Sequence, residues 1–359
     1  MQININNFLL ALSLFFIVVI GSISIYSVTS IDLNYFFRFL TISVFSIILV
    51  STFFYFVNFN RIISIGWIIF LLNIILIISV EFFGKEINGS KRWLDFGFLS
   101  LQPSEFLKVS FAIFVIQYLR YFDFKFTVIR SVILLAILVV SALPIIIQPD
   151  LGTGIVFFAF GLLLLFICGM KFKYFFILAL SFLVLSPAIY SYGLSDYQKG
   201  RILNWFSSED TLAESWNILQ SKISIGSGEL LGEGFLGSKQ NEFNFLPESD
   251  TDFIFSIYAE QFGFLGVGLI LILLGIFIFS GLSGFRQKNI LADDYSAYYL
   301  GIYFLMVITF SFLINIFMVS GLIPVVGLPL PFFTKGGSSL LCFSIMLGFI
   351  FSAKTYLKT

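Results

Sequence analysis

The sequence predicts an all-α fold: a polytopic integral membrane protein with ten transmembrane helices and a large extracytoplasmic loop between helices 7 and 8. Hydrophobic residues make up 59% of the 359 residues and charged residues only 11%, whereas soluble domains carry about 25% charged residues. The hydrophobic residues gather in runs of about 20, the length that crosses ~30 Å of hydrocarbon. The segment 193–251 is the long polar interruption between two such runs.

We expect each apolar run to form one helix of a single membrane domain, 1–359, that contains the loop 193–251. The first run is not expected to be a cleaved signal, because residues 1–7 lack Lys and Arg and the run exceeds a signal's apolar core. The expected helices lie near residues 8–28, 36–57, 62–83, 104–122, 127–148, 150–169, 173–192, 252–280, 295–320 and 336–353.

Charges in the short loops predict the orientation. With the N-terminus inside, ten Lys and Arg residues and only three acids fall at cytoplasmic helix ends. Because Lys and Arg favour the cytoplasmic side of short loops, we expect both termini in the cytoplasm and 193–251 outside. The basic residues are Arg61, Arg120, Lys125, Arg130, Lys171, Lys173, Arg286, Lys288, Lys354 and Lys358, and the acids are Asp123, Asp293 and Asp294.

All eight prolines then fall on or near the outer side. Proline removes a helix hydrogen bond, and irregular backbone at membrane depth is tolerated where protein or a water-filled cavity surrounds it. Helix ends that need a stop explain part of this skew. An elaborated outer face explains the rest, so we expect the functional site to face the periplasm or exterior.

Composition excludes several kinds of chemistry. The chain has no histidine, which excludes Ser-His-Asp and His-zinc schemes. Cys168 and Cys342 lie in separate apolar runs and are predicted to pack as small hydrophobic residues. Lys plus Arg and Asp plus Glu number 20 each, so the charge balance gives no indication of a nucleic-acid partner.

Asp252 is the first candidate functional residue, because it lies where the polar loop re-enters apolar sequence. A carboxylate at that depth is costly to keep and marks a functional site by default. The alternative is an acid that stabilises the N-terminus of the next helix. Glu260, eight residues on, is predicted to share its helical face.

The outer segment 84–104 and the helix after it carry further candidates. Pro103 and Ser104 are typical of a helix start, which places Glu105 and Lys108 three residues apart, where they can pair. Such a pair either fixes helix packing or lines a polar cleft. Arg92 and Trp93 precede it and fit either a phosphate and a sugar face or an interfacial anchor.

Three more candidates lie in other outer segments. Asp150, in a tight hairpin, either caps the next helix or serves the site. Lys222 lies in a segment with apolar residues at helical spacing, suited to the membrane interface. Five glycines within 226–237 indicate flexible backbone able to approach a ligand closely. Lys335 precedes a glycine pair at the start of the last helix.

Several motifs in these segments resemble the SEDS family (shape, elongation, division and sporulation). They occur in the same order over residues 85–345, and the stretch 318–327 is closer to the RodA branch than to the division paralogue FtsW. The motifs are Gly89-Ser90-Lys91-Arg92-Trp93, Gln102-Pro103-Ser104-Glu105, Gln148-Pro149-Asp150-Leu151-Gly152-Thr153, Gln220-Ser221-Lys222-Ile223, Phe245-Leu246-Pro247-Glu248, Thr251-Asp252-Phe253-Ile254-Phe255 and Leu328-Pro329-Leu330-Pro331.

The resemblance implies a peptidoglycan glycosyltransferase of the bacterial inner membrane that polymerises lipid II into β-1,4 glycan strands on the outer face during cell elongation. In the family the acid of the Thr-Asp-Phe-Ile-Phe motif is the catalytic residue, which is Asp252 here. Two positions depart from the pattern: Asp250 replaces a frequent His, and Lys335 a common Tyr. A second acid beside Asp252 is expected to raise its pKa.

The resemblance also implies partners: a class B penicillin-binding protein (a transpeptidase), other rod-complex proteins, lipid II and membrane lipid, with no nucleic acid. Asp252 is the predicted general base on the acceptor hydroxyl. We expect no cofactor other than a divalent cation, Mg²⁺ or Mn²⁺, held by carboxylate and phosphate oxygens. The predicted substrate-binding residues are Arg92, Trp93, Glu105, Lys108, Asp150, Lys222, Glu260 and Lys335.

Three alternatives remain open at the level of sequence. A flippase of the lipid-linked precursor would use intramembrane charges and broken helices equally well. A non-catalytic scaffold of a cell-wall synthase would leave Asp252 as a helix cap. The division role of the FtsW paralogue would keep the chemistry and change its place in the cell.

Overall fold

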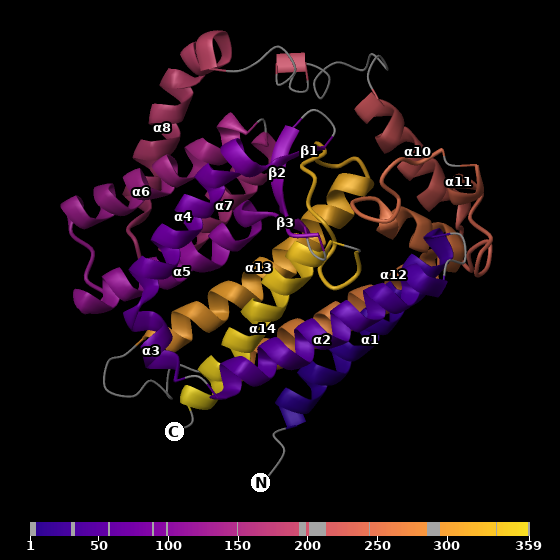
Figure 1. Cartoon of the computed structure of the whole chain (residues 1–359), viewed down its shortest axis with the longest axis horizontal. Helices are drawn as coiled ribbons and strands as arrows, with labels where there is room; N and C mark the ends of the chain where they lie inside the picture. Colours follow the sequence, from indigo (N-terminus) through magenta and orange to yellow (C-terminus); the bar gives the residue numbers. More distant parts are fainter. Residues whose placement is uncertain are drawn as a thin grey trace. The chain divides into compact units, whose positions relative to one another are not determined.

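The computed structural model describes residues 5–29, 33–56, 58–87, 90–97, 100–148, 150–193, 199–200, 213–243, 245–285, 295–334 and 336–357. The chain divides into two compact units (Figure 1). The terminal unit comprises residues 1–62 with 216–359, and the middle unit comprises residues 63–215.

The middle unit is a helical cluster with a small sheet. Helix α5 packs on α4 and α7, and α6 packs on α7 and α4. Strand β2 lies against α4 and α5. Its elements are α4 (Gly66–Phe83), β1 (Lys85–Ile87), β2 (Ser90–Asp95), β3 (Ser100–Leu101), α5 (Pro103–Tyr121), α6 (Val128–Ile147), α7 (Leu151–Ile167), α8 (Phe172–Ala188) and a π-helical turn, η1 (Ile189–Gly193).

The terminal unit brings the two ends of the chain together. Helix α1 packs along α12, α2 packs along α14, and α13 lies against both α12 and α14. Its elements are α1 (Ile5–Val28), α2 (Leu33–Phe56), α10 (Ala213–Ser227), α11 (Lys239–Glu242), α12 (Ile254–Leu282), α13 (Ser296–Val319) and α14 (Gly337–Tyr356), with α3 (Phe59–Ser64) at the boundary of the two units.

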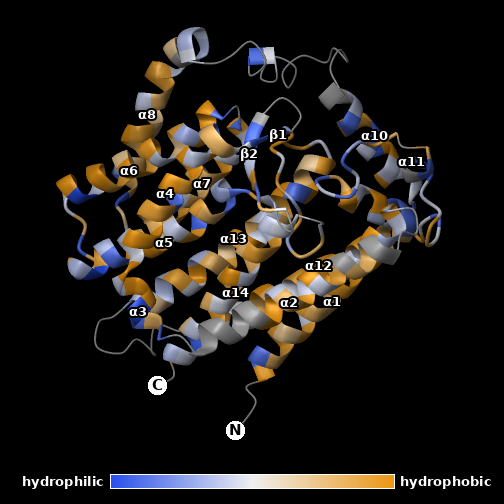
Figure 2. Cartoon of the chain, in the orientation of Figure 1, coloured by the Kyte–Doolittle hydropathy of each residue, from blue (hydrophilic) through white to orange (hydrophobic). Residues whose placement is uncertain are grey.

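The fold is mostly helical, as predicted, and six of the described helices are long and apolar enough to cross a membrane. Figure 2 shows apolar residues along these helices and polar residues around α11 and β2. The prediction of ten crossings goes beyond this finding and stays a prediction. The six helices are Ile5–Val28, Gly66–Phe83, Val128–Ile147, Ile254–Leu282, Ser296–Val319 and Gly337–Tyr356.

The segment 84–104 contains regular structure that was not predicted from the sequence. Strands β1, β2 and β3 form an antiparallel sheet in that order, with Lys85 opposite Trp93. An exposed ion pair joins Lys85 Nζ to Asp95 Oδ2 at 3.1 Å. The sheet gives the residues before α5 a fixed backbone.

Two predicted helices are interrupted. Instead of one helix over 62–83, α3 ends at Ser64 and α4 begins at Gly66, because the Gln117 side chain accepts from Trp67 N and donates to Ser64 O. Instead of one regular helix over 252–280, α12 is broken at Gly263, which has φ 61° and ψ −162°.

Candidate functional site

Asp252 lies in the turn that leads into α12, with its side chain half-buried. Its backbone oxygen accepts a hydrogen bond of 2.9 Å from Nδ2 of Asn315 on α13. The same nitrogen donates to Leu328 O at 2.8 Å. Asn315 therefore ties the turn that carries Asp252 to the proline-rich segment 321–334.

Gly327 in that segment faces the Asp252 carboxylate. A Cβ at Gly327 would lie 3.5 Å from Asp252 Oδ2, and the glycine has φ 65°. An L-residue would be strained at this backbone angle. The segment thus brings bare backbone close to the candidate base.

Lys222 lies on α10, whose opposite face is buried against α12. Ser221 Oγ and Ser256 Oγ are 2.6 Å apart, and Ser221 also donates to Val319 O at 2.6 Å. The Lys222 side chain is exposed and extends over Gly321, where a Cβ would overlap it. The predicted helix around Lys222 is confirmed. Its buried face carries Ser221 and Ser224.

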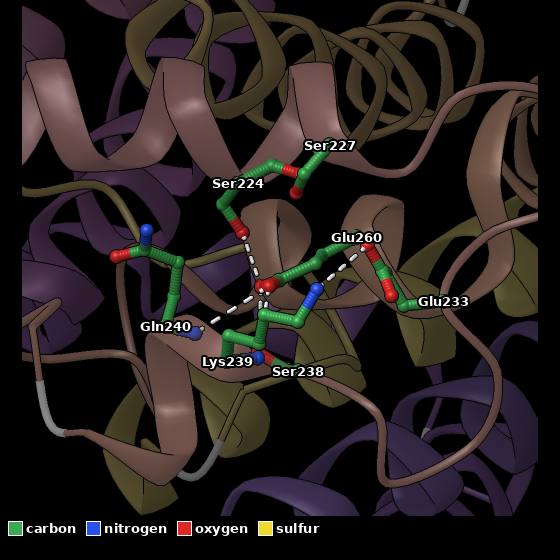
Figure 3. Close-up of polar contacts among 7 residues, drawn as sticks. All are labelled: Ser224, Ser227, Glu233, Ser238, Lys239, Gln240 and Glu260. Carbon is green, nitrogen blue, oxygen red and sulfur yellow. Dashed lines mark hydrogen bonds and ion pairs between the residues drawn. The ribbon is translucent and has the colours of Figure 1, made fainter.

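Glu260 is buried, with 1% of its surface exposed. Its Oε2 accepts from Ser224 Oγ at 2.8 Å and from Ser238 Oγ at 2.6 Å. Its Oε1 accepts from the backbone N–H groups of Lys239 at 3.0 Å and Gln240 at 3.4 Å, the first amides of α11 (Figure 3). Both oxygens therefore have donors within the protein.

The glycine-rich segment 228–237 approaches α12 rather than open space. A Cβ on Gly232 would overlap the backbone of Gln261 and Phe262, and a Cβ on Gly263 would overlap the backbone of Gly232. Both glycines have positive φ, 82° and 61°. Close backbone approach, predicted from these glycines, occurs here between two parts of the chain.

The middle unit holds a second polar cluster around Asp150, the N-cap of α7. Asp150 Oδ1 accepts from Thr153 N at 3.3 Å, and Arg92 Nη1 lies 3.8 Å from the same oxygen. Gln102 Nε2 donates to Asp150 Oδ2 at 3.4 Å. Burial raises the pKa of the Asp150 carboxyl above its ordinary value, and the attractions of Arg92 and Thr153 offset only part of that.

Glu105 and Lys108 form the ion pair that their spacing predicts. Lys108 Nζ lies 2.7 Å from Glu105 Oε2, and the side chains are 1% and 4% exposed, respectively. Burying two charges is costly, so each depends on the other. This degree of burial favours the packing role over a polar cleft.

The eight predicted substrate-binding residues therefore separate into groups. Arg92, Glu105, Lys108 and Asp150 belong to the middle unit, as does the half-buried Trp93 on β2. Lys222 and Glu260 belong to the terminal unit with Asp252. Lys335 lies outside the described residues.

The sequence analysis did not single out Asn315, Ser224 or Ser256. Each is a small polar residue inside an apolar or amphipathic helix, and each is fully buried. A buried amide or hydroxyl is costly without a hydrogen-bond partner. That cost is the signal that could have identified them, although it does not identify the partner.

Together these features define a class: a multi-pass helical membrane protein with a carboxylate fixed at the head of a broken helix. The family model described as "Cell cycle protein", for FtsW, RodA and SpoVE, matches residues 2–359. The chain belongs to this family, the SEDS family that its motifs resemble.

Relatives and solved structures agree with this assignment. Peptidoglycan glycosyltransferase MrdB of Escherichia coli K12 is 34% identical over 296 residues, 82% of this chain and 79% of that protein. A structure from a study of polymerization and crosslinking by a peptidoglycan synthase complex matches with TM-score 0.78 and 22% identity over 97% of each chain. Thermus thermophilus RodA matches with TM-score 0.71 and 21% identity over 98% of this chain and 97% of that one. The two structures show that the fold is shared.

Proposed function

We propose that this chain polymerises lipid II into β-1,4 glycan strands, with Asp252 as the general base. Family membership, together with relatives named as peptidoglycan glycosyltransferases, makes the chain a peptidoglycan glycosyltransferase. The observation that supports Asp252 as the base is its placement. It is a half-buried carboxylate at the head of a helix that is apolar enough to span the membrane, and Asn315 fixes its backbone.

The reaction joins two lipid-linked disaccharides. The 4-hydroxyl of the acceptor GlcNAc attacks C1 of the donor MurNAc, the bond from C1 to the pyrophosphate breaks, and the anomeric centre inverts. The hydroxyl proton passes to Asp252, and the electron pair of the broken bond leaves with the polyprenyl pyrophosphate. A positioned base contributes about 10²–10⁴-fold to such a step.

Positive charge on the leaving pyrophosphate is the second requirement. In the terminal unit, the exposed side chain of Lys222 is suited to this role, and we assign it the pyrophosphate. For the other predicted substrate contacts, Arg92, Trp93, Glu105, Lys108, Asp150 and Lys335, a direct role stays a prediction.

A divalent cation fits this site only with help from substrate. Among the described residues no three Cys, Asp or Glu side chains gather into a group that could hold a metal ion. Mg²⁺ or Mn²⁺ would therefore be bound largely by phosphate oxygens of the donor, together with fewer than three of these carboxylates. When bound, such a cation neutralises charge on the departing pyrophosphate.

We extend the six candidate spans to ten, in a bacterial inner membrane, with both termini cytoplasmic and Asp252 facing outward. Helices α2, α7 and α8 occupy three of the four other predicted runs, and α5 the fourth. The charge distribution in the short loops supports this orientation. The segment 193–251 is then the large outer loop, within a single membrane domain.

We assign a transpeptidase of the class B penicillin-binding type as the partner that crosslinks the product. A similar fold occurs in the peptidoglycan synthase complex that coordinates polymerization and crosslinking. We assign this chain to cell elongation, as for RodA, rather than to division, as for FtsW. This assignment depends on the motif at 318–327.

One observation favours a lipid-precursor flippase as the second candidate. Helix α12 is broken at Gly263, and broken membrane helices are common in transporters. A transporter moves the precursor and leaves it a monomer, so the product separates the two functions.

The test supplies labelled lipid II to the purified chain with its transpeptidase in detergent, and resolves the products on a gel. We expect a ladder of glycan polymers from the wild type and none from Asp252→Asn. A folded, partner-bound wild type that makes no polymer contradicts the proposal and favours the flippase.

A further inference from the structure

Glu260 joins three separate parts of the outer region through one carboxylate. Ser224 brings α10, and Ser238 with the first two amides of α11 brings the segment after the glycines (Figure 3). The side chain of Lys239 turns away, and its Nζ pairs with Glu233 at 3.2 Å. The buried acid is thus satisfied by two hydroxyls and two backbone N–H groups.

The same outer segment also completes the break in α12. At Gly263 the regular helix ladder stops, which frees backbone groups on either side. The backbone N–H groups of Glu233 and Gly234 donate to the backbone oxygens of Glu260 and Gln261, at 2.9 and 3.1 Å respectively. In return, Phe264 N and Leu265 N donate to the oxygens of Glu229 and Leu230 at 2.9 and 3.2 Å.

A line of polar contacts leads from Glu260 back to Ser256, four residues after Asp252. Ser256 and Glu260, four residues apart on α12, share one face of that helix, and Asp252 lies in the turn just before it. Ser224 Oγ lies 3.0 Å from Ser256 O, and Ser221 Oγ lies 2.6 Å from Ser256 Oγ. Helix α10, held at Glu260, therefore also contacts Ser256 near the start of the helix that follows the candidate base.

The other end of α10 holds the chain just before Asp252. Trp216 Nε1 donates to Phe245 O at 3.1 Å. Helix α10 thus contacts the segment that carries Asp252 on both sides of that residue, at Phe245 and at Ser256. If α10 moves away from α12, the contacts at Phe245 and at Ser256 change together.

We propose that Glu260 is a positioning residue of the transferase: its carboxylate seats α10 and the segment 228–243 on α12, and this fixes Asp252 and Lys222 for the reaction. The inference rests on the proposed function and adds to it. It assigns Glu260 to the geometry of the base rather than to substrate. A small displacement of a reacting group costs up to about 100-fold in rate.

Two substitutions separate the hydrogen bonds from the charge. Glu260→Ala removes all four contacts. Glu260→Gln keeps the side-chain length and all four contacts without the charge. The amide oxygen of Gln would accept from the two backbone N–H groups, and its nitrogen would donate to the two serine oxygens. Glu233→Gln is the matched control, since it removes a charge from the same segment and leaves the donors to Glu260 in place.

The experiment measures hydrogen exchange and lipid II polymerisation of the full chain in complex with its transpeptidase. We expect faster exchange across 228–243 in Glu260→Ala, with Glu260→Gln and Glu233→Gln like the wild type. We expect kcat to fall at least about tenfold in Glu260→Ala, with KM for lipid II within about threefold. Glu260→Gln should keep kcat within about threefold.

A pH profile distinguishes positioning from a loss of folded protein. A loss of folded protein lowers kcat by the same factor at every pH. A displaced base also shifts the pH at which kcat falls on the acidic side of the profile. A Glu260→Ala profile that superimposes on the wild type after scaling overturns the proposal. So does an Ala variant with normal kcat, or a Gln variant as poor as Ala.

The exchange data separate this inference from the proposed function. If the wild type makes no polymer, the transferase assignment fails, while faster exchange in Glu260→Ala still supports the seating of α10. Unchanged exchange in that variant overturns the role of Glu260 whatever the activity. Faster exchange with unchanged kcat leaves Glu260 as a structural residue and overturns its positioning role.

Discussion

Asn315 donates from one amide nitrogen to the backbone oxygens of Asp252 and Leu328, at 2.9 and 2.8 Å. Asn315 is fully buried in the apolar helix α13. A buried amide N–H group without an acceptor is costly. The two acceptors of Asn315 belong to the turn that carries Asp252 and to the proline-rich segment 321–334.

Removal of this amide should lower both stability and activity. Asn315→Ala removes the hydrogen bonds to the Asp252 and Leu328 carbonyls, and the loss of each typically costs about 0.5–1.5 kcal/mol. Thermal unfolding in detergent and the polymerisation rate measure the two effects. Ser311→Ala, one turn earlier and bonded only within its own helix to Val307 O, should change neither by much. Equal effects of the two substitutions would contradict a special role for Asn315.

The broken helix predicts opposite effects for two glycines of α12. Gly263→Ala places a Cβ at φ 61° into the backbone of the segment 228–232, so we expect a large loss of thermal stability. Gly268 has open space around it, and Gly268→Ala should be neutral or stabilising by up to about 1 kcal/mol. A Gly263→Ala variant as stable as Gly268→Ala would be incompatible with the break.

The buried pair predicts a non-additive mutant cycle. Glu105→Gln or Lys108→Met alone removes the ion-pair partner of a buried charge, which typically costs about 3–5 kcal/mol. The double variant removes both charges and should be more stable than at least one single variant. Unfolding of the four proteins in detergent measures this. Strictly additive losses would show that the two charges do not depend on each other.

Asp150 predicts a pH dependence of defined sign. Its pKa is raised by burial above the ordinary 3.8, so the folded state holds the proton more tightly than the unfolded state. The contribution of this group to stability is therefore greatest below pH 3.8 and falls as the pH rises through the raised pKa. The unfolding temperature of the wild type should fall relative to Asp150→Asn as the pH rises. A constant difference, or a rise, would contradict this.

Local patterns predicted a good part of the site. The spacing of Glu105 and Lys108 sufficed to pair them, because three residues is nearly one helical turn. The common face of Asp252 and Glu260 stays a prediction, because Asp252 lies in the turn before α12. The hydrophobic runs located the long helices, since length and composition decide which helices can span a membrane.

Contacts between distant parts of the sequence were not predictable in this way. Nothing local to Asn315 indicates that it holds Asp252, 63 residues earlier. The glycines of 226–237 indicated close backbone approach, but the partner, the break at Gly263, depends on tertiary structure. The small sheet had a missed local signal, because Asn88-Gly89 between two polar runs is typical of a hairpin.

The rate of lipid II polymerisation by Asp252→Asn, measured beside Asp250→Asn, tests the central claim most directly. Both changes remove one negative charge from the same half-buried turn, so they are matched in charge and place. We predict that Asp252→Asn lowers kcat by about 10²–10⁴-fold, and that Asp250→Asn stays within about tenfold of the wild type. A folded, partner-bound Asp252→Asn variant that polymerises at the wild-type rate would show that Asp252 is not the base.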